Sequence, residues 1–522
     1  MRPLRVGILD LVTKSPTRSL WARVMHPNLA SIMPQAVGAW CQQAGHEVTF
    51  VCFTGPEDLV SDFPDDMDIL FIGAFTQAAQ LSYALSNLFR QRGVVTVLGG
   101  PHARCYPDDA VKYFDYVLGF TNREMVEEVL QDCRPHPEEG RQMCAGVQPL
   151  QLPSIQERWP FVAPTMAKSP TKIKAVPMLS SLGCPYTCSF CIDSVVKYQP
   201  FDADQLRDEL RFIANQVPGA WIGWHDPNFG VRFDEIMTSV EAVGPGRLVH
   251  AAESSLSLLA EDRMGRLRDA GFVAILPGVE SWYSLGNKSK TGSKEGRDKV
   301  DQVSAHLNLL MEYVPYVQAN FVLGLDCDEG SEPFELTKEF VDKTPGVFPG
   351  YSLLSAFGEA APLNLEYQEN GRVLPFPFHF LNNNGAMNVR PKNYDWPEFY
   401  DNVIDLTRYT FSRPRILKRA KANRGFSRWL NVVRAVSSEG AGRIKYYTKV
   451  RKLLDEDRAF RRYFEGETHQ IPDFFVDQVK NDLGPLWKYL PDGALYHDEL
   501  AYLKKTKRQP ISDAGPAVAA AN

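Results

Sequence analysis

Short apolar runs alternate with amphipathic helical stretches along the first 150 residues. In the stretch 77–92, for example, Leu81, Leu85 and Leu88 fall on one helical face. The apolar runs are Leu4–Val12, Val48–Phe53, Asp68–Phe75, Val94–Gly100 and Tyr116–Phe120. This alternation predicts a doubly wound α/β domain over residues 1–150, with a parallel sheet of about five strands. Ligands of such sheets bind at the carboxyl ends of the strands.

A second alternation of strands and helices begins at residue 176. Its strand candidates are Val176–Leu182, Ala220–Asp226, Leu248–Ser254, Val273–Glu280, Val317–Leu325 and Tyr351–Phe357. These units predict a partial parallel (β/α)6 barrel over residues 176–365. The stretch 151–175, with little periodic pattern, is interpreted as a linker between the two α/β domains.

The pattern changes again after residue 365. Aromatic residues and prolines are dense over 374–411, and a helical pattern then continues to about residue 505. We expect a mostly helical C-terminal domain over 366–505. The tail 506–522, which ends in AGPAVAAAN, is predicted to be disordered.

Composition and charge exclude several classes of protein. The chain has 522 residues with 57 basic and 63 acidic side chains, and its net charge of −6 argues against a general nucleic-acid binder. No run of about 18 apolar residues occurs, so no membrane span is expected. The first residues lack a signal-peptide cleavage pattern, and the odd count of nine cysteines indicates reduced thiols in the cytoplasm.

Three of the nine cysteines are clustered. Cys184, Cys188 and Cys191 lie in SSLGCPYTCSFC, directly after an apolar strand, where their thiolates can converge on a soft metal centre. Iron–sulfur clusters usually take four cysteines, so three would leave one iron open to a substrate. The alternative is a structural zinc site. Its nearest downstream fourth ligands, His225 and Cys327, lack finger-like spacing.

The cysteine loop resembles the signature of the radical S-adenosylmethionine (SAM) superfamily. That signature is CxxxCxxC after the first barrel strand, with an aromatic residue, here Phe190, just before the third cysteine. The resemblance implies that Cys184, Cys188 and Cys191 ligate a [4Fe-4S] cluster whose open iron chelates SAM. Reduction would then cleave SAM to methionine and a 5′-deoxyadenosyl radical.

Polar residues at later strand ends fit the same resemblance. Asp226 and Asn228 lie at the end of the second strand, where the family contacts the SAM amino group. Glu253 and Ser255 lie at the end of the third, where ribose and carboxylate contacts usually lie. Glu280 lies in GVES, which resembles a family G-I-E-S element. A carboxylate such as Glu253 can accept hydrogen bonds from ribose hydroxyls. The alternative for each acidic residue is a solvated strand end or a helix cap.

The first domain resembles the cobalamin-binding domain that precedes the barrel in many radical SAM enzymes. The resemblance rests on LGGPHAR, with Gly99, Gly100 and His102, and on FDYVLG, which ends at Gly119. Without a Cβ atom, the two glycines let the backbone pass close beneath a large flat ring. The resemblance also places Thr76 near the cofactor's nucleotide tail or side-chain amides, and it gives His102 a possible cofactor contact.

Two departures from the cobalamin-binding pattern are visible. The sequence after the FDYVLG strand is GFTNRE rather than GEGE, which puts contacts there in doubt. None of the ten histidines has an Asp two residues before it, so the DxHxxG motif for a histidine lower ligand is missing. The resemblance therefore implies cobalamin bound without a histidine ligand. The alternative is a flavodoxin-like or Rossmann-like sheet that packs on the barrel and binds nothing.

Together these resemblances imply a cobalamin-dependent radical SAM C-methyltransferase. Such an enzyme methylates an unactivated carbon by means of a 5′-deoxyadenosyl radical and methylcobalamin. Two alternatives stay open. One is an enzyme with the same cofactors that catalyses cyclisation, rearrangement or oxidation without methyl transfer, and the other is a non-catalytic cobalamin-sensing protein.

The partners expected for this function are a small-molecule or natural-product substrate and an external electron donor such as flavodoxin or ferredoxin. The sequence does not identify the substrate. The basic segment 413–428 has seven Lys or Arg and no acid, and is interpreted either as a solvated helix face or as a contact for an anion.

Overall fold

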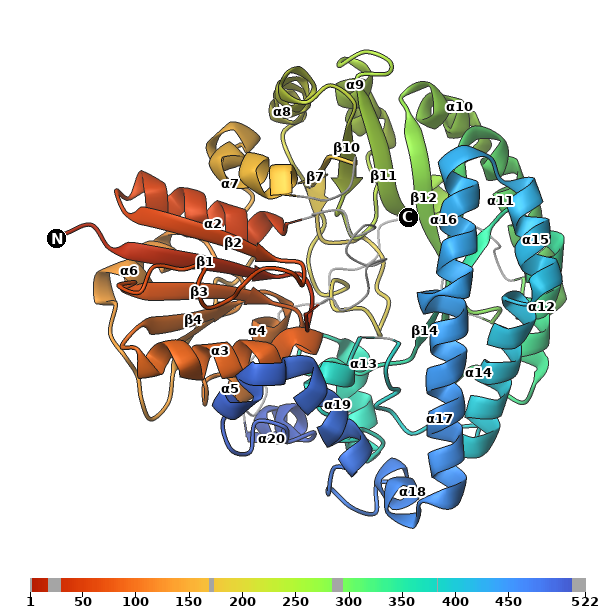
Figure 1. Ribbon diagram of the computed structural model, residues 1–522. Helices are drawn as coiled ribbons and strands as arrows, with labels where there is room; N and C mark the ends of the chain where they lie inside the picture. Colours follow the sequence, from red (N-terminus) through yellow and green to blue (C-terminus); the bar gives the residue numbers. More distant parts are fainter. Residues whose placement is uncertain (1, 17–29, 169–172, 284–293, 383, 509–522) are drawn as a thin grey trace.

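The computed structural model describes residues 2–16, 30–168, 173–283, 294–382 and 384–508. Two parallel sheets face each other across the middle of the molecule, and a group of helices closes one side (Figure 1). None of the helices in these ranges is long and apolar enough to cross a membrane.

The first sheet is parallel and has the strand order β2-β1-β3-β4-β5-β6. Its strands are β1 (Arg5–Leu11), β2 (Glu47–Phe53), β3 (Ile69–Ala74), β4 (Val95–Gly99), β5 (Tyr116–Leu118) and β6 (Arg141–Met143). Its helices are α2 (Ile32–Gln43), α3 (Ala79–Gln91), α4 (Pro101–Cys105), α5 (Pro107–Ala110) and α6 (Arg123–Asp132). On one face of the sheet, Val6 and Ile8 of β1 belong to the same hydrophobic cluster as the buried residues of α2. Leu9 and Leu11 belong to the main hydrophobic core. The expected doubly wound sheet is therefore confirmed, with β6 as an additional edge strand.

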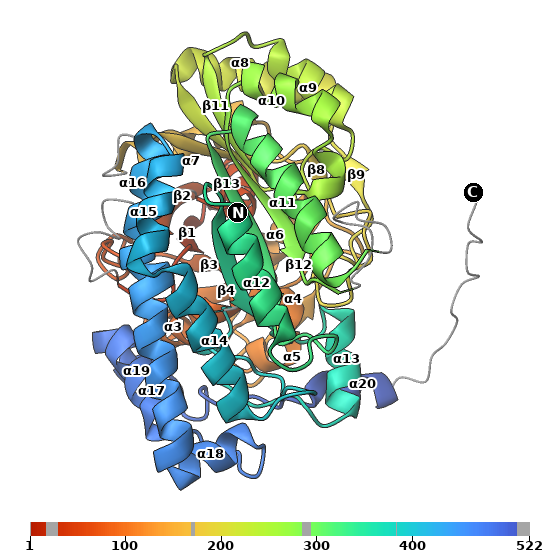
Figure 2. The same cartoon turned by 90° about the vertical axis from the view of Figure 1, so that its right-hand side faces the viewer.

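The second sheet is also parallel, with the order β14-β13-β12-β11-β10-β7. Its strands are β7 (Ala175–Met178), β10 (Ala220–Trp224), β11 (Leu248–Ser255), β12 (Phe272–Glu280), β13 (Tyr316–Leu323) and β14 (Phe348–Leu353). The outer helices are α8 (Ala203–Gln216), α9 (Phe233–Glu241), α10 (Glu261–Asp269), α11 (Gly296–Tyr313) and α12 (Glu332–Lys343). They cover one face of the sheet (Figure 2). The two edge strands, β7 and β14, do not pair with each other, so the sheet does not close into a full barrel. It is therefore the partial barrel that the sequence predicts.

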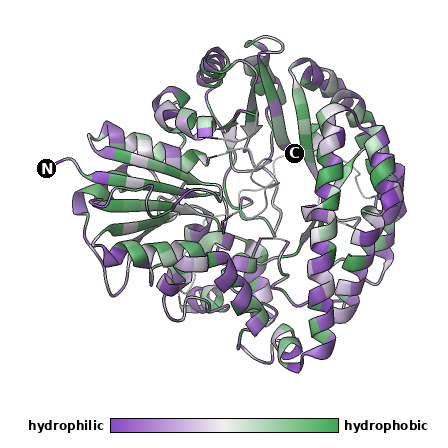
Figure 3. Cartoon of the chain, viewed as in Figure 1, coloured by the Kyte–Doolittle hydropathy of each residue, from purple (hydrophilic) through white to green (hydrophobic). Residues whose placement is uncertain are grey.

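Strands of the half barrel alternate between fully and partly buried residues. In β10, for example, Ala220, Ile222 and Trp224 are buried, whereas Trp221 and Gly223 are half-buried. The buried set packs under the outer helices, whose outward residues are hydrophilic (Figure 3). The partly exposed set therefore lines the inner face, which is the face available to a ligand.

A small antiparallel pair closes the base of the cysteine loop. It joins β8 (Ser181–Leu182) to β9 (Gln199–Pro200). Gly183 follows β8 with φ +68°, and a Cβ atom there would lie 2.3 Å from the carbonyl oxygen of Val196. Only glycine fits this turn, which directs the chain into the loop that carries the three cysteines.

The C-terminal region is helical, as expected. Its helices are α13 (Pro362–Glu369), α14 (Trp396–Thr410), α15 (Arg413–Ala422), α16 (Gly425–Val436), α17 (Arg443–Glu456), α18 (Arg458–Phe464), α19 (Asp473–Leu483) and α20 (Ala501–Arg508). In its core, Phe376 packs edge to face against Phe464 and Phe475. Within the basic segment, Arg419 is buried and donates to the carbonyl of Val347, and Arg415 pairs with Asp342. Part of that segment therefore stabilises the packing of α15.

Two boundaries differ from expectation. Most of the segment 151–175 is not a linker, because helix α7 (Ile155–Lys168) occupies it and buries Ile155, Phe161 and Val162. Helix α20 extends into the expected tail, and residues 509–522 lie outside the described ranges.

Candidate active site

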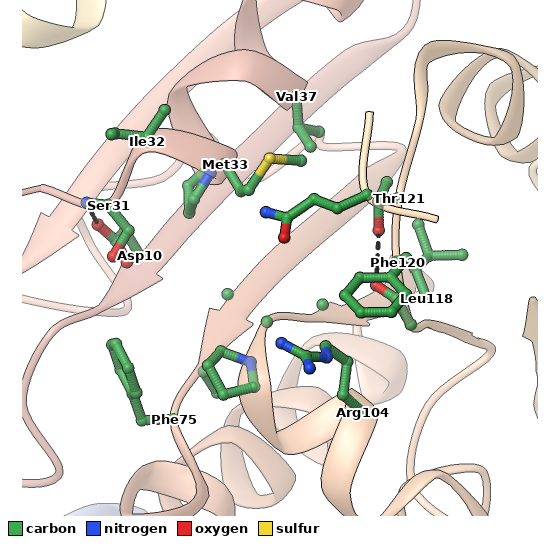
Figure 4. A pocket seen from close by; sticks show the side chains of 18 of the residues that line it. Asp10, Ser31, Ile32, Met33, Val37, Phe75, Arg104, Leu118, Phe120 and Thr121 are labelled. Carbon is green, nitrogen blue, oxygen red and sulfur yellow. Dashed lines mark hydrogen bonds between the residues drawn. The ribbon is translucent and has the colours of Figure 1, made fainter. Parts of the chain in front are cut away.

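A deep cleft separates the carboxyl ends of the first sheet from the cysteine loop of the half barrel. It holds about 1350 Å³ of space, counted out to its open mouth. The first domain contributes Asp10, Gly73, Phe75, Gly99, Gly100, Arg104, Gly119 and Phe120, among others (Figure 4). The opposite wall includes Leu182, Gly183, Asp193, His225 and Pro227. The cleft therefore lies where the two domains meet, at the end of the sheet where ligands of doubly wound folds bind.

The floor of this cleft fits a large flat group. A Cβ atom on Gly99 would meet no atom within 4 Å, so the open space of the cleft begins directly above its backbone. Gly100 has φ +91°, and a Cβ atom there would lie 2.9 Å from the carbonyl oxygen of Ala74. Both predicted glycines line the cleft, as does Gly119. The geometry is thus compatible with the cobalamin expected from the sequence.

Asp10 lies in the wall of the cleft near the end of β1. The backbone N–H of Ser31 donates to its carboxylate at 2.5 Å. Burial raises the pKa of Asp10 to about 6, although this hydrogen bond opposes the rise.

Replacing Asp10 with Asn is expected to change how stability depends on pH. Because the folded-state pKa of about 6 exceeds the ordinary value of 3.8, Asp10 lowers the free energy of unfolding as the pH rises from 4 to 6. The loss amounts to about 3 kcal/mol. Asn keeps an oxygen acceptor for Ser31 without the charge. The variant should match the wild type at pH 4 and be more stable at pH 7. Thermal denaturation across this range measures the difference, and a constant difference would contradict the prediction.

Two predicted cofactor contacts do not lie on the cleft wall. The ring of His102 is buried, and its Nε2 forms a 2.6 Å hydrogen bond with the hydroxyl oxygen of Tyr83. The same Tyr83 hydroxyl donates a hydrogen bond to Asp109. Phe378 packs edge-on against the same ring. Thr76 is also buried and is not among the lining residues. The position of His102 on the buried side of α4 explains the difference, because its neighbours Pro101 and Arg104 line the cleft instead.

The three cysteines share one half-exposed loop. Cys184, Cys188 and Cys191 are thiols of intermediate burial and lie outside the hydrophobic core. The backbone N–H of Cys191 donates to the carbonyl of Cys188 at 3.0 Å, and the N–H of Asp193 lies 3.4 Å from the Cys191 sulfur. These backbone N–H groups hold the turn of the loop and reach the Cys191 sulfur.

The spacing of these thiols bears on which metal group the loop suits. Within the described ranges, no three His, Cys, Asp or Glu side chains are close enough to hold a metal ion. A zinc ion needs its ligand sulfurs at about 2.3 Å from one centre. In an iron–sulfur cluster each cysteine binds a different iron, so the thiols can stand farther apart. The donor set of three thiols therefore suits a cluster better than the zinc alternative.

Asp226 and Asn228 connect the cysteine loop to the half barrel. The Asp226 carboxylate accepts hydrogen bonds from the Ser180 hydroxyl at 2.6 Å and the Ser181 hydroxyl at 2.7 Å. Asn228 accepts from the backbone N–H of Ser255 at 2.8 Å, and its amide nitrogen lies 3.9 Å from the Cys184 sulfur. Asp226 is fully buried, so its place in the structure is to hold the start of the loop rather than to face a ligand.

The remaining predicted residues lie on or near the inner face of the half barrel. Glu253 is exposed near the end of β11, and Ser255 is buried two residues later. Glu280 ends β12 with φ +65°, a conformation that non-glycine residues rarely adopt. Such strain is concentrated at functional sites, where surrounding structure maintains it. Phe190 in the cysteine loop is half-buried and packs against the main core.

Sequence comparison finds two methyltransferases among proteins of assigned function. Bacteriochlorophyllide d C-8(2)-methyltransferase of Chlorobaculum tepidum is 24% identical over 334 residues, which cover 60% of this chain and 71% of the relative. Bacteriochlorophyllide d C-12(1)-methyltransferase of the same organism is 22% identical over 72% of this chain and 81% of its own length. No protein-family model matches the chain.

Two solved structures share the fold over most of this chain. The radical SAM methyltransferase TsrM from Kitasatospora setae, solved with tryptophan and a SAM analogue, superposes with a TM-score of 0.53 and 13% identity, covering 86% of this chain and 99% of TsrM. The cobalamin-dependent SAM radical enzyme OxsB, solved with aqua-cobalamin and SAM, gives 0.53 and 14%, covering 98% and 82%. This chain has the fold of the cobalamin-dependent radical SAM enzymes.

Several polar residues near the cleft and the cysteine loop of this cobalamin-dependent radical SAM fold were not predicted from the sequence. Ser180 and Ser181 bind Asp226, and the Tyr186 hydroxyl of the cysteine loop bonds to the Ser257 hydroxyl at 2.5 Å. His225 lines the cleft, and its surroundings lower its pKa by desolvation. Single serines and tyrosines carry no motif, so the only available signal was their closeness in sequence to Cys184 and Asp226.

Proposed function

We propose that this protein is a cobalamin-dependent radical SAM C-methyltransferase that acts on an unactivated carbon of a small-molecule substrate. The observation that supports this most directly is the shared cleft. Gly99 and Gly100 form one wall, and Gly183 and Asp193, at the two ends of the cysteine segment, form the other. Both curated relatives found by sequence are named as methyltransferases.

In this proposal we give each cofactor a place. Cys184, Cys188 and Cys191 would hold a [4Fe-4S] cluster, with SAM on the side of Glu253, Ser255 and Glu280. Gly99, Gly100 and Gly119 would lie against cobalamin, without a histidine lower ligand from a DxHxxG motif. When bound, the cluster and SAM supply the radical that removes a hydrogen atom from the substrate carbon, and cobalamin supplies the methyl group.

The protein's own contribution is positioning and the exclusion of water. Asp226 fixes the start of the cysteine loop through Ser180 and Ser181, and Asn228 links Cys184 to β11. The cleft is bounded largely by apolar side chains such as Ile8 and Phe71. A dry, preorganised site keeps a reactive radical away from solvent and holds the reacting atoms close together.

Product mass and SAM consumption test the proposal. Anaerobically reconstituted protein with cluster, cobalamin and reductant is incubated with candidate substrates. Methylation adds one CH₂ and consumes two SAM per product. A product of changed structure without added CH₂ would indicate the alternative without methyl transfer. The absence of both cluster absorbance and deoxyadenosine would instead favour the cobalamin-sensing alternative.

The domain ranges and cellular setting belong to the same proposal. We assign residues 1–150 to cobalamin, 176–365 to the radical SAM domain and 366–505 to the helical domain. The expected electron donor is a flavodoxin or ferredoxin. All nine cysteines are thiols, which suits the reducing cytoplasm.

A further inference from the structure

Helix α4 contacts both walls of the cleft. It starts directly after Gly100, and its last residue, Cys105, accepts a hydrogen bond from the backbone N–H of Glu359 at 2.9 Å. A Cβ atom on Gly358 would lie 1.7 Å from the same Cys105 carbonyl oxygen. The Tyr106 hydroxyl donates to the carbonyl of Ala356 at 3.2 Å. Helix α4, which follows Gly99 and Gly100 on the floor of the cleft, is therefore anchored to the chain segment after β14.

That segment after β14 also holds the cysteine loop. The backbone N–H of Leu363 donates to the carbonyl of Ser189 at 2.9 Å, between the second and third cysteines. Helix α4 and the cysteine loop are thus fixed to one common stretch, 356–363. Because both are bound to it, a direct bond between them would complete a closed ring of contacts.

Arg104 of α4 makes that direct bond. Its Nη2 donates to the carbonyl of Ile192 at 3.0 Å, and its Nη1 lies 3.7 Å from the carboxylate of Asp193. The guanidinium carbon lies 4.3 Å from the ring centre of Phe120, also in the cleft wall (Figure 4). Its side chain is 16% exposed, so these contacts are largely shielded from solvent. Buried charge-assisted bonds to a planar guanidinium fix both distance and orientation.

The two residues bound by Arg104 directly follow the third cysteine. The backbone N–H of Asp193 points at the Cys191 sulfur at 3.4 Å. A displacement of residues 192–193 would therefore move the end of the loop that carries Cys191. Small shifts of this kind are costly in reactions that require close approach of two reacting groups.

We propose that Arg104 is a positioning residue that fixes Cys191 and its loop relative to the glycine floor, and so sets one spacing between the two cofactor sites. The assignment of those sites rests on the proposed function. The role of Arg104 as a link between helix and loop is measurable without any cofactor.

Hydrogen exchange on the cofactor-free protein tests the link. Arg104→Met removes the charge and both polar contacts but keeps an extended side chain, and Arg104→Lys keeps the charge. The matched control is Arg123→Met, which removes an exposed arginine that pairs with Glu127 on α6. We expect amides of 188–194 to exchange about tenfold faster in Arg104→Met, less in Arg104→Lys, and unchanged in the control. Unchanged exchange in Arg104→Met would overturn the proposal.

The loaded protein gives a second, distance-dependent test. Arg104→Met should retain its iron and cobalamin but change the magnetic interaction between the reduced cluster and paramagnetic cobalt, seen by electron paramagnetic resonance. Its ratio of deoxyadenosine to methylated product should rise about tenfold, with partial recovery in Arg104→Lys. An unchanged magnetic interaction and ratio would refute the role of Arg104. Absence of methylated product in the wild type would refute the proposed function instead, while the exchange experiment still decides on Arg104.

Discussion

Alanine at Cys184, Cys188 and Cys191 together is expected to abolish the cleavage of SAM to 5′-deoxyadenosine. These three cysteines are the cluster ligands that we propose, and thiolates bind iron–sulfur clusters through bonds that alanine cannot replace. Without a cluster there is no open iron to bind SAM and no electron to cleave it. We expect deoxyadenosine release to fall to the background of the assay.

The triple variant should still fold, which makes the result interpretable. All three cysteines are half-exposed and none belongs to the hydrophobic core, so their loss leaves no large cavity. Circular dichroism and cobalamin binding should therefore match the wild type. Cys144→Ala, which removes an exposed thiol in the first domain, is the matched control and should retain full cleavage. SAM cleavage retained by the triple variant would contradict the assignment of the cluster.

The first parallel sheet was predictable because its central strands, β1, β3 and β4, are buried on both faces. In β1 every residue after Arg5 is buried, and the strand appears in the sequence as an apolar run interrupted only by Asp10. Strand β6 escaped prediction because it is a three-residue edge strand with an exposed Arg141 and Gln142. Helix α7 escaped because Pro160 and Pro164 interrupt its pattern, although the helix forms through burial of Phe161 and Val162.

The positions of backbone atoms in the candidate site were predictable from motifs. The directions in which side chains point were less predictable. Gly99, Gly100 and Gly119 line the cleft as expected, since their place follows from the strand ends. His102 follows the same strand, but its side chain turns toward Tyr83 in the core. A five-residue helix presents neighbouring side chains in different directions, and the sequence does not say which neighbour will face the ligand.

Phenylalanine at Gly99 is expected to abolish cobalamin binding while leaving the fold intact. A Cβ atom on Gly99 meets no protein atom within 4 Å, so the added side chain starts in open space. It must extend into the space that a flat ring would occupy against the floor of the cleft. We expect retained cobalamin to fall about a hundredfold or more, because the ring and the cofactor cannot share this space.

A second glycine serves as the matched control, because it shows whether a phenyl ring added elsewhere in the protein also lowers cobalamin binding. Gly265 on α10 also has no atom within 4 Å of its Cβ position, and it lies outside the cleft. Gly265→Phe should therefore bind cobalamin like the wild type, as measured by absorbance after reconstitution and gel filtration. Gly99→Phe should keep its iron content and its cleavage of SAM, because the cysteine loop belongs to the other wall. Full cobalamin binding by Gly99→Phe would place the cofactor elsewhere, whereas loss of both cofactors would mean that the two walls fold as one unit. Selective loss of cobalamin alone is the result that ties methyl transfer to this floor and SAM cleavage to the loop opposite it.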